Sequence, residues 1–186
     1  MTSIWAPSVA AALDDALITL ALAVGMCEGT PWEDCMWEVP ARDPEQPLAG
    51  PGGALVTDAA ERLALVQRFS MPWSVAWHAL EVVDYYLTGA LSPWAGPPEP
   101  FTHHPHWRDF TGLPRAWQQS EILGYVEHCR QCVRDTFDGL TDERAATPTP
   151  AMPWTPYARV LIGLVAHTNE HAAQILQHMN AISRRP

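Results

Sequence analysis

The chain has 186 residues, of which 47% are hydrophobic and 17% charged, and its formal net charge is −10. This length suits one domain with a sizeable core, and the composition is that of a globular protein rather than a disordered one. All 11 basic residues are arginines, scattered from Arg42 to Arg185 without forming a basic stripe. Because phosphate binding requires clustered cations, we expect neither nucleic acid nor a membrane as a partner.

The first predicted element is an amphipathic helix over about Ser8–Met26, with apolar residues at three- and four-residue spacings. Its most apolar run, 16–26, follows two aspartates instead of a basic segment and is too short to span a bilayer, so it predicts neither a signal peptide nor a transmembrane helix. We therefore expect a cytoplasmic protein with reduced thiols. The cysteines are Cys27, Cys35, Cys129 and Cys132.

A stretch rich in proline and glycine, Gly29–Gly53, predicts a long surface connection. Asp58 and Glu61 then form a pattern similar to a capping box. A helix is expected over Asp58–Phe69, either as a separate short helix or as the kinked front of the next one, because Pro72 disfavours helix at Met71.

The sequence predicts three further long helices, with Ser70 and Thr155 as N-caps of the first and last, and an irregular stretch over Ser92–Pro114. No convincing period-2 strand stands out. Amphipathic helices joined by loops predict an all-α bundle formed by one domain, 1–186. The three helices are expected from Pro72 to about Thr88, from Ser120 to about Gly139, and from Pro156 almost to the C-terminus.

Histidines lie on the apolar stripes of two of these helices. His167 and His171 are four residues apart on the last helix, so their rings project from one face about 6 Å apart and can reach one ion. His78 lies on the inner stripe of the helix that starts at Pro72. Three imidazoles can supply Zn-like bonds of about 2.0–2.1 Å and leave other positions open. The pattern predicts a metal site, with ordinary core histidines as the alternative.

The motifs around these histidines resemble the DinB-like family. Residues 77–80, Trp-His-Ala-Leu, followed by Asp-Tyr-Tyr-Leu at 84–87, are similar to the second helix of that family. Residues 167–175, His-Thr-Asn-Glu-His-Ala-Ala-Gln-Ile, are similar to its last-helix signature, although Ala173 stands where the family often has glycine. The resemblance extends over about Pro72–Met179, and the two histidine motifs carry it.

This resemblance implies a DinB-like four-helix bundle with long Pro-rich connecting loops, in which His78, His167 and His171 bind one divalent metal ion. Zinc or nickel is expected first, and iron or manganese is possible. Several other residues are candidates for lining a pocket or for positioning the ligands, namely His103, His104, Glu170, Gln174 and Trp77. For His103 and His104, the alternative is an ordinary aromatic surface loop.

Three functions remain open at this point. Some DinB-like proteins transfer small thiols such as bacillithiol, mycothiol or glutathione to electrophiles, which suggests a metal-dependent S-transferase with a small-molecule thiol and an electrophile as partners. An open metal position also suits a hydrolase or isomerase that activates water. The third is a non-catalytic protein in which the metal only holds the helix bundle together. The sequence also leaves a homodimer open.

Two further motifs match known chemistry, but a peptidase role is not favoured for the first and a structural role is favoured for the second, with a redox or metal role as the alternative for the cysteines. The segment from His167 to His171 fits the H-x-x-E-H pattern of some peptidases, but their additional glutamate ligand has no counterpart after His171. Cys129 and Cys132 form a C-x-x-C pair in the middle of a predicted helix instead of at its start, where redox motifs lie. Cys129 is therefore expected to pack as a small hydrophobic residue.

Overall fold

The computed structural model describes residues 3–27, 29–36, 56–102 and 115–184. These residues are mostly helical, as the sequence predicts, with one short hairpin that it does not predict. The elements are α1 (Ala6–Gly25), η1 (Thr30–Glu33), α2 (Ala59–Arg68), α3 (Pro72–Asp84), a π-helical turn η3 (Tyr85–Gly89), α4 (Gln119–Asp138), α5 (Asp142–Ala146), β1 (Pro148–Thr149), β2 (Met152–Pro156) and α6 (Tyr157–Ser183).

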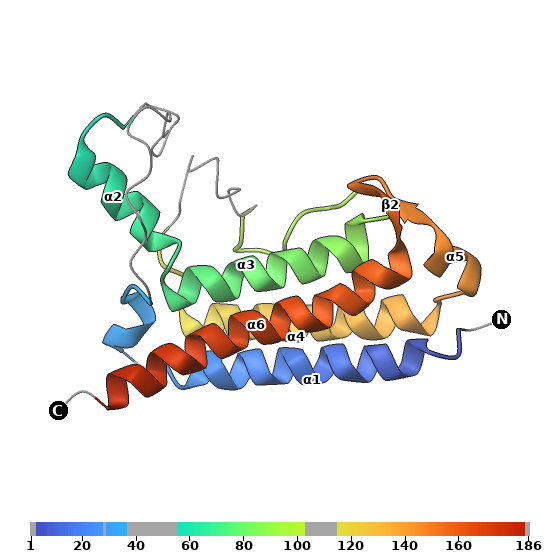
Figure 1. The fold of residues 1–186 in the computed structure, drawn as a ribbon, viewed down its shortest axis with the longest axis horizontal. Helices are drawn as coiled ribbons and strands as arrows, with labels where there is room; N and C mark the ends of the chain where they lie inside the picture. Colours follow the sequence, from blue (N-terminus) through green and yellow to red (C-terminus); the bar gives the residue numbers. More distant parts are fainter. Residues whose placement is uncertain (1–2, 28, 37–55, 103–114, 185–186) are drawn as a thin grey trace.

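Four long helices lie side by side along the length of the molecule (Figure 1). Helices α1 and α6 run in one direction, and α3 and α4 run in the other. Both α1 and α3 pack mainly against α4 and α6. Consequently α1 and α3 are diagonally opposite, and α3 has one side facing α6 and another facing α4.

Helix α3 is the most enclosed of the four. Of its 13 residues, 11 are buried, and the two that are not are His78 and Val82. Trp73 and Trp77 are fully enclosed and belong to the same core as Leu13, Leu17 and other α1 residues. Burial of these large apolar surfaces fixes the rotation of α3, so that His78 is held at its more open side.

The chain between the long helices departs from the predicted boundaries in several places. Asp58 accepts the Glu61 amide proton at 2.8 Å, as expected of a cap, and α2 is a separate helix. The Ser70 hydroxyl instead donates to the Gln67 carbonyl at 2.7 Å, so the prediction that Ser70 caps the next helix is wrong. Thr155 lies in β2 and caps nothing, because β2 pairs with β1 just before α6 begins.

The length of α1 also corrects the expectation that this segment is too short to span a bilayer. Helix α1 has 20 residues and is apolar and long enough to cross a bilayer by length and composition alone. Core helices and signal sequences share these properties, and here α1 packs against α4 and α6. Its buried side carries the regularly spaced apolar residues that predict the helix, among them Leu13, Leu17, Leu20 and Val24.

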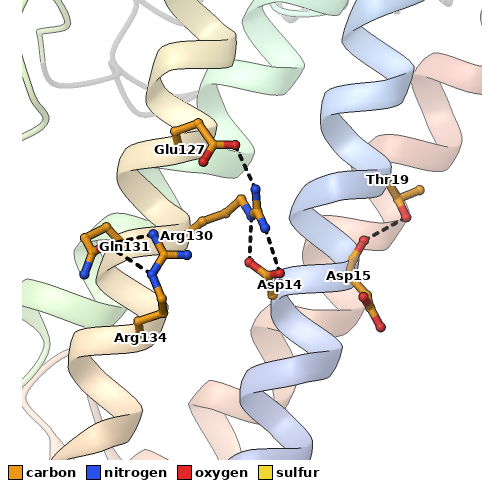
Figure 2. A network of polar contacts seen from close by, with 7 residues as sticks. All are labelled: Asp14, Asp15, Thr19, Glu127, Arg130, Gln131 and Arg134. Carbon is orange, nitrogen blue, oxygen red and sulfur yellow. Dashed lines mark hydrogen bonds and ion pairs between the residues drawn. The ribbon is translucent and has the colours of Figure 1, made fainter.

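An ion-pair network joins α1 to α4 (Figure 2). The Arg130 guanidinium donates from Nε to Asp14 Oδ1 at 2.7 Å and from Nη2 to Asp14 Oδ2 at 3.0 Å, and its Nη1 reaches Glu127 Oε1 at 2.9 Å. The hydrogen bonds from Arg130 lower the pKa of the Asp14 carboxyl below its ordinary value. The pair is partly exposed, which limits its contribution to stability.

We expect Asp14→Asn to lower the free energy of unfolding by about 0.5–1 kcal/mol at neutral pH. Since the folded-state pKa of Asp14 is lowered, its contribution is complete above the unfolded-state pKa and is lost as the pH falls through the folded-state value. Urea unfolding at several pH values measures this. The neighbouring Asp15→Asn is the control, because Asp15 is exposed. Equal effects of the two variants at every pH would contradict the prediction.

Candidate metal centre

The three predicted histidines meet between α3 and α6. One ring nitrogen from each of His78, His167 and His171 lies within 4.8 Å of the others. The Nε2 atoms of His167 and His171 are 3.2 Å apart. Two nitrogens bound to one ion at about 2.0–2.1 Å, with angles between octahedral and tetrahedral, are roughly 2.9–3.4 Å apart. The separation of the pair therefore fits a shared ion.

The histidines lie beside the core stripe of α6 and not at its centre. The most buried α6 residues are Tyr157, Leu161, Leu164, Thr168, Ala172 and Ile175, whereas His167 and His171 are half-buried. The sequence places both histidines on the apolar stripe of this helix; Leu164 and Ile175 on that stripe are buried, but the histidines lie at its edge. His78 is half-buried as well. The centre consequently has a side that is open to solvent, which a small molecule needs in order to reach it.

Gln174 holds His171 in the orientation that a metal ligand requires. Nδ1 of His171 lies 2.9 Å from Gln174 Oε1, one turn further along α6. When Nδ1–H donates to this carbonyl oxygen, the proton is fixed on Nδ1 and the lone pair of Nε2 faces His167. Gln174 thus lies where the sequence places a residue that supports the ligands.

His167 is neutral at physiological pH. Burial lowers its pKa to about 4, and the neighbouring His171 lowers it in the same direction. Only a neutral imidazole offers a lone pair to a cation, so the environment of His167 keeps it ready to bind one. The donor set and the protonation state therefore both fit a borderline divalent ion such as zinc.

Two of the other predicted site residues, Trp77 and Glu170, do not join this centre. Trp77 is fully buried and packs on Trp73 and Trp117 at centroid distances of 6.1 and 5.7 Å, so it belongs to the core and not to a pocket. Glu170 is exposed and does not line the site, which also leaves the H-x-x-E-H motif without a placed base. His103 and His104 lie outside the described residues.

A second group of candidate ligands, which the sequence analysis misses, lies between α3 and α4. It consists of Asp84, His128 and Cys132, and one ligand atom from each lies within 4.8 Å of the others. Asp84 and Cys132 are buried, and His128 is partly exposed. The signal in the sequence is the spacing of His128 and Cys132, which are four residues apart on one helix. Cys129 is fully buried as a small core residue, as predicted.

No protein-family model, curated protein or solved structure gives a significant match to this chain.

Proposed function

We propose that the chain is a DinB-like four-helix-bundle protein that binds one divalent ion on His78, His167 and His171 and catalyses transfer of a small thiol to an electrophile. One observation carries this proposal. Among the described residues, no fourth histidine, cysteine or carboxylate joins the three-histidine group. Structural zinc sites normally have four protein ligands, whereas catalytic sites keep three and leave one position open.

The chemistry follows from this open position. When bound, the ion supplies a Lewis-acid site that favours a thiolate over a thiol at neutral pH. His167 and His171 would hold it from one helix, and Gln174 would orient the His171 ring through its contact with Nδ1. The enclosed helix α3 keeps His78 opposite them. The thiol proton leaves to solvent, and the sulfur electron pair forms the new bond to the electrophile while the leaving group departs with its own pair.

The proposal is tested with a panel of thiols and monochlorobimane as the electrophile. The panel contains mycothiol, bacillithiol, glutathione and cysteine, and each is assayed with stripped and metal-reconstituted protein. We expect conjugation above background with at least one thiol, dependent on metal and lost in His167→Ala. His178→Ala is the control, because His178 lies on the same helix about 10 Å beyond His171. Rates equal to background across the panel, or an unchanged rate in His167→Ala, would reject the proposed activity.

A further inference from the structure

The second ligand group repeats the construction of the first. In each group, two ligands that are four residues apart on one helix face a single ligand from α3. In the first group, the pair is His167 and His171 on α6, and the single ligand is His78. In the second, His128 and Cys132 on α4 face Asp84 at the end of α3. His78 and Asp84 are separated by about 9 Å along α3 and by more than a quarter turn around it. The two groups therefore lie on different sides of the same helix.

The contacts of His128 converge on one atom. Its Nε2 lies 3.4 Å from Asp84 Oδ1 and 3.4 Å from Cys132 Sγ. A nucleophile–base–carboxylate triad needs both ring nitrogens, one toward the thiol and the other toward the carboxylate. This geometry consequently does not make Cys132 a relay-activated nucleophile. Ligands bound tetrahedrally to one ion at about 2.0–2.3 Å are roughly 3.3–3.6 Å apart, and both distances fall in that range.

Asp84 is held in place as a ligand would be. Its side chain is almost completely buried, and the residue is 1% exposed. Tyr125 donates its hydroxyl proton to Oδ2 at 3.1 Å. The Thr88 hydroxyl lies 2.8 Å from the Asp84 backbone carbonyl oxygen and 3.1 Å from Oδ1, and its one proton is shared between these two acceptors. Such hydrogen bonds orient a ligating carboxylate, but they supply no positive charge. A buried carboxylate is costly unless a cation accompanies it. A protonated His128 would supply that charge across the 3.4 Å between its Nε2 and Oδ1, and an ion shared by Asp84, His128 and Cys132 would supply it with a neutral His128.

We propose that Asp84, His128 and Cys132 form a second divalent-metal site, with ligands from α3 and α4, that takes a borderline cation such as Zn²⁺. A thiolate among the ligands favours Zn²⁺ over Mg²⁺ and Ca²⁺. The side chain of His128 is 39% exposed, which gives the ion a route from solvent. On binding, the ion replaces the thiol proton of Cys132, and that proton leaves to the buffer.

Cobalt titration distinguishes this site from the three-histidine centre, because only one of the two contains sulfur. Full-length, untagged protein is stripped of metal and titrated with Co²⁺ while the near-ultraviolet thiolate-to-cobalt charge-transfer band is recorded. We expect this band in wild type and in His167→Ala, and its loss in Cys132→Ser and in His128→Ala. Cys35→Ser is the matched control, since Cys35 is exposed and lies far from α4 in the sequence. A band absent from wild type, or one that persists in Cys132→Ser, would overturn the proposal.

Alkylation tests the same site in the wild-type protein, so the result does not depend on whether the variants fold. Stripped wild-type protein is treated with iodoacetamide with and without Zn²⁺, and the modified cysteines are identified by peptide mass spectrometry. We expect Zn²⁺ to slow modification of Cys132 at least tenfold while leaving that of Cys35 unchanged. Equal modification of Cys132 in the presence and absence of Zn²⁺ would count against the site.

Discussion

His171→Ala is expected to reduce the divalent metal held by the three-histidine centre from about one ion per chain to nearly none. The variant removes the nitrogen that lies 3.2 Å from that of His167, and it leaves only two imidazoles, on different helices, to hold an ion. Elemental analysis after gel filtration of untagged protein measures the loss. The measurement is made in a Cys132→Ser background, so that metal at the second site does not contribute.

Two companion variants sharpen this result. His178→Ala removes a histidine from the same helix, two turns further along, and should retain its metal. Gln174→Ala keeps all three ligands but removes the acceptor of the His171 Nδ1 proton, so we expect metal affinity to fall by about 10–100-fold. Competition with a chelator gives these affinities. Full metal content in His171→Ala would show that the ion, if one binds, is held elsewhere.

The long helices were predictable because their apolar periodicity extends over many turns. Leu13, Leu17 and Leu20 show the buried side of α1 directly in the sequence. The hairpin was not predictable, because β1 has two residues and β2 includes prolines, which leaves no alternating pattern to detect. Ser70 failed as a predicted cap because its hydroxyl bonds to the end of the preceding helix instead.

The proximity of His167 and His171 was predictable because a four-residue spacing on one helix brings two side chains together, whereas His78 was predicted from its place on the inner stripe of another helix. How deeply the histidines of α6 are buried was not predictable. Thr168 and Ala172 occupy the buried side of this helix, and neither is strongly apolar. Asp84 lies close to His128 and Cys132 because of how α3 packs against α4. Periodicity within each helix does not predict how the two helices are rotated relative to each other. Trp77 shows the same limit, since an aromatic residue beside a candidate ligand suits a pocket and a core equally well.

Trp77→Ala is expected to lower the free energy of unfolding by about 3–5 kcal/mol, because it leaves a large cavity in the core. Trp77 is 0% exposed and loses contacts with both Trp73 and Trp117. Urea unfolding should show a lower midpoint with an unchanged slope. Trp154→Ala, which removes a tryptophan that is 80% exposed, should change stability by less than about 0.5 kcal/mol. Equal effects on stability would mean that Trp77 does not anchor α3.

Since that anchoring turns the adjacent His78 toward α6, we also expect Trp77→Ala to weaken metal binding at the three-histidine centre, and Trp154→Ala to leave it unchanged.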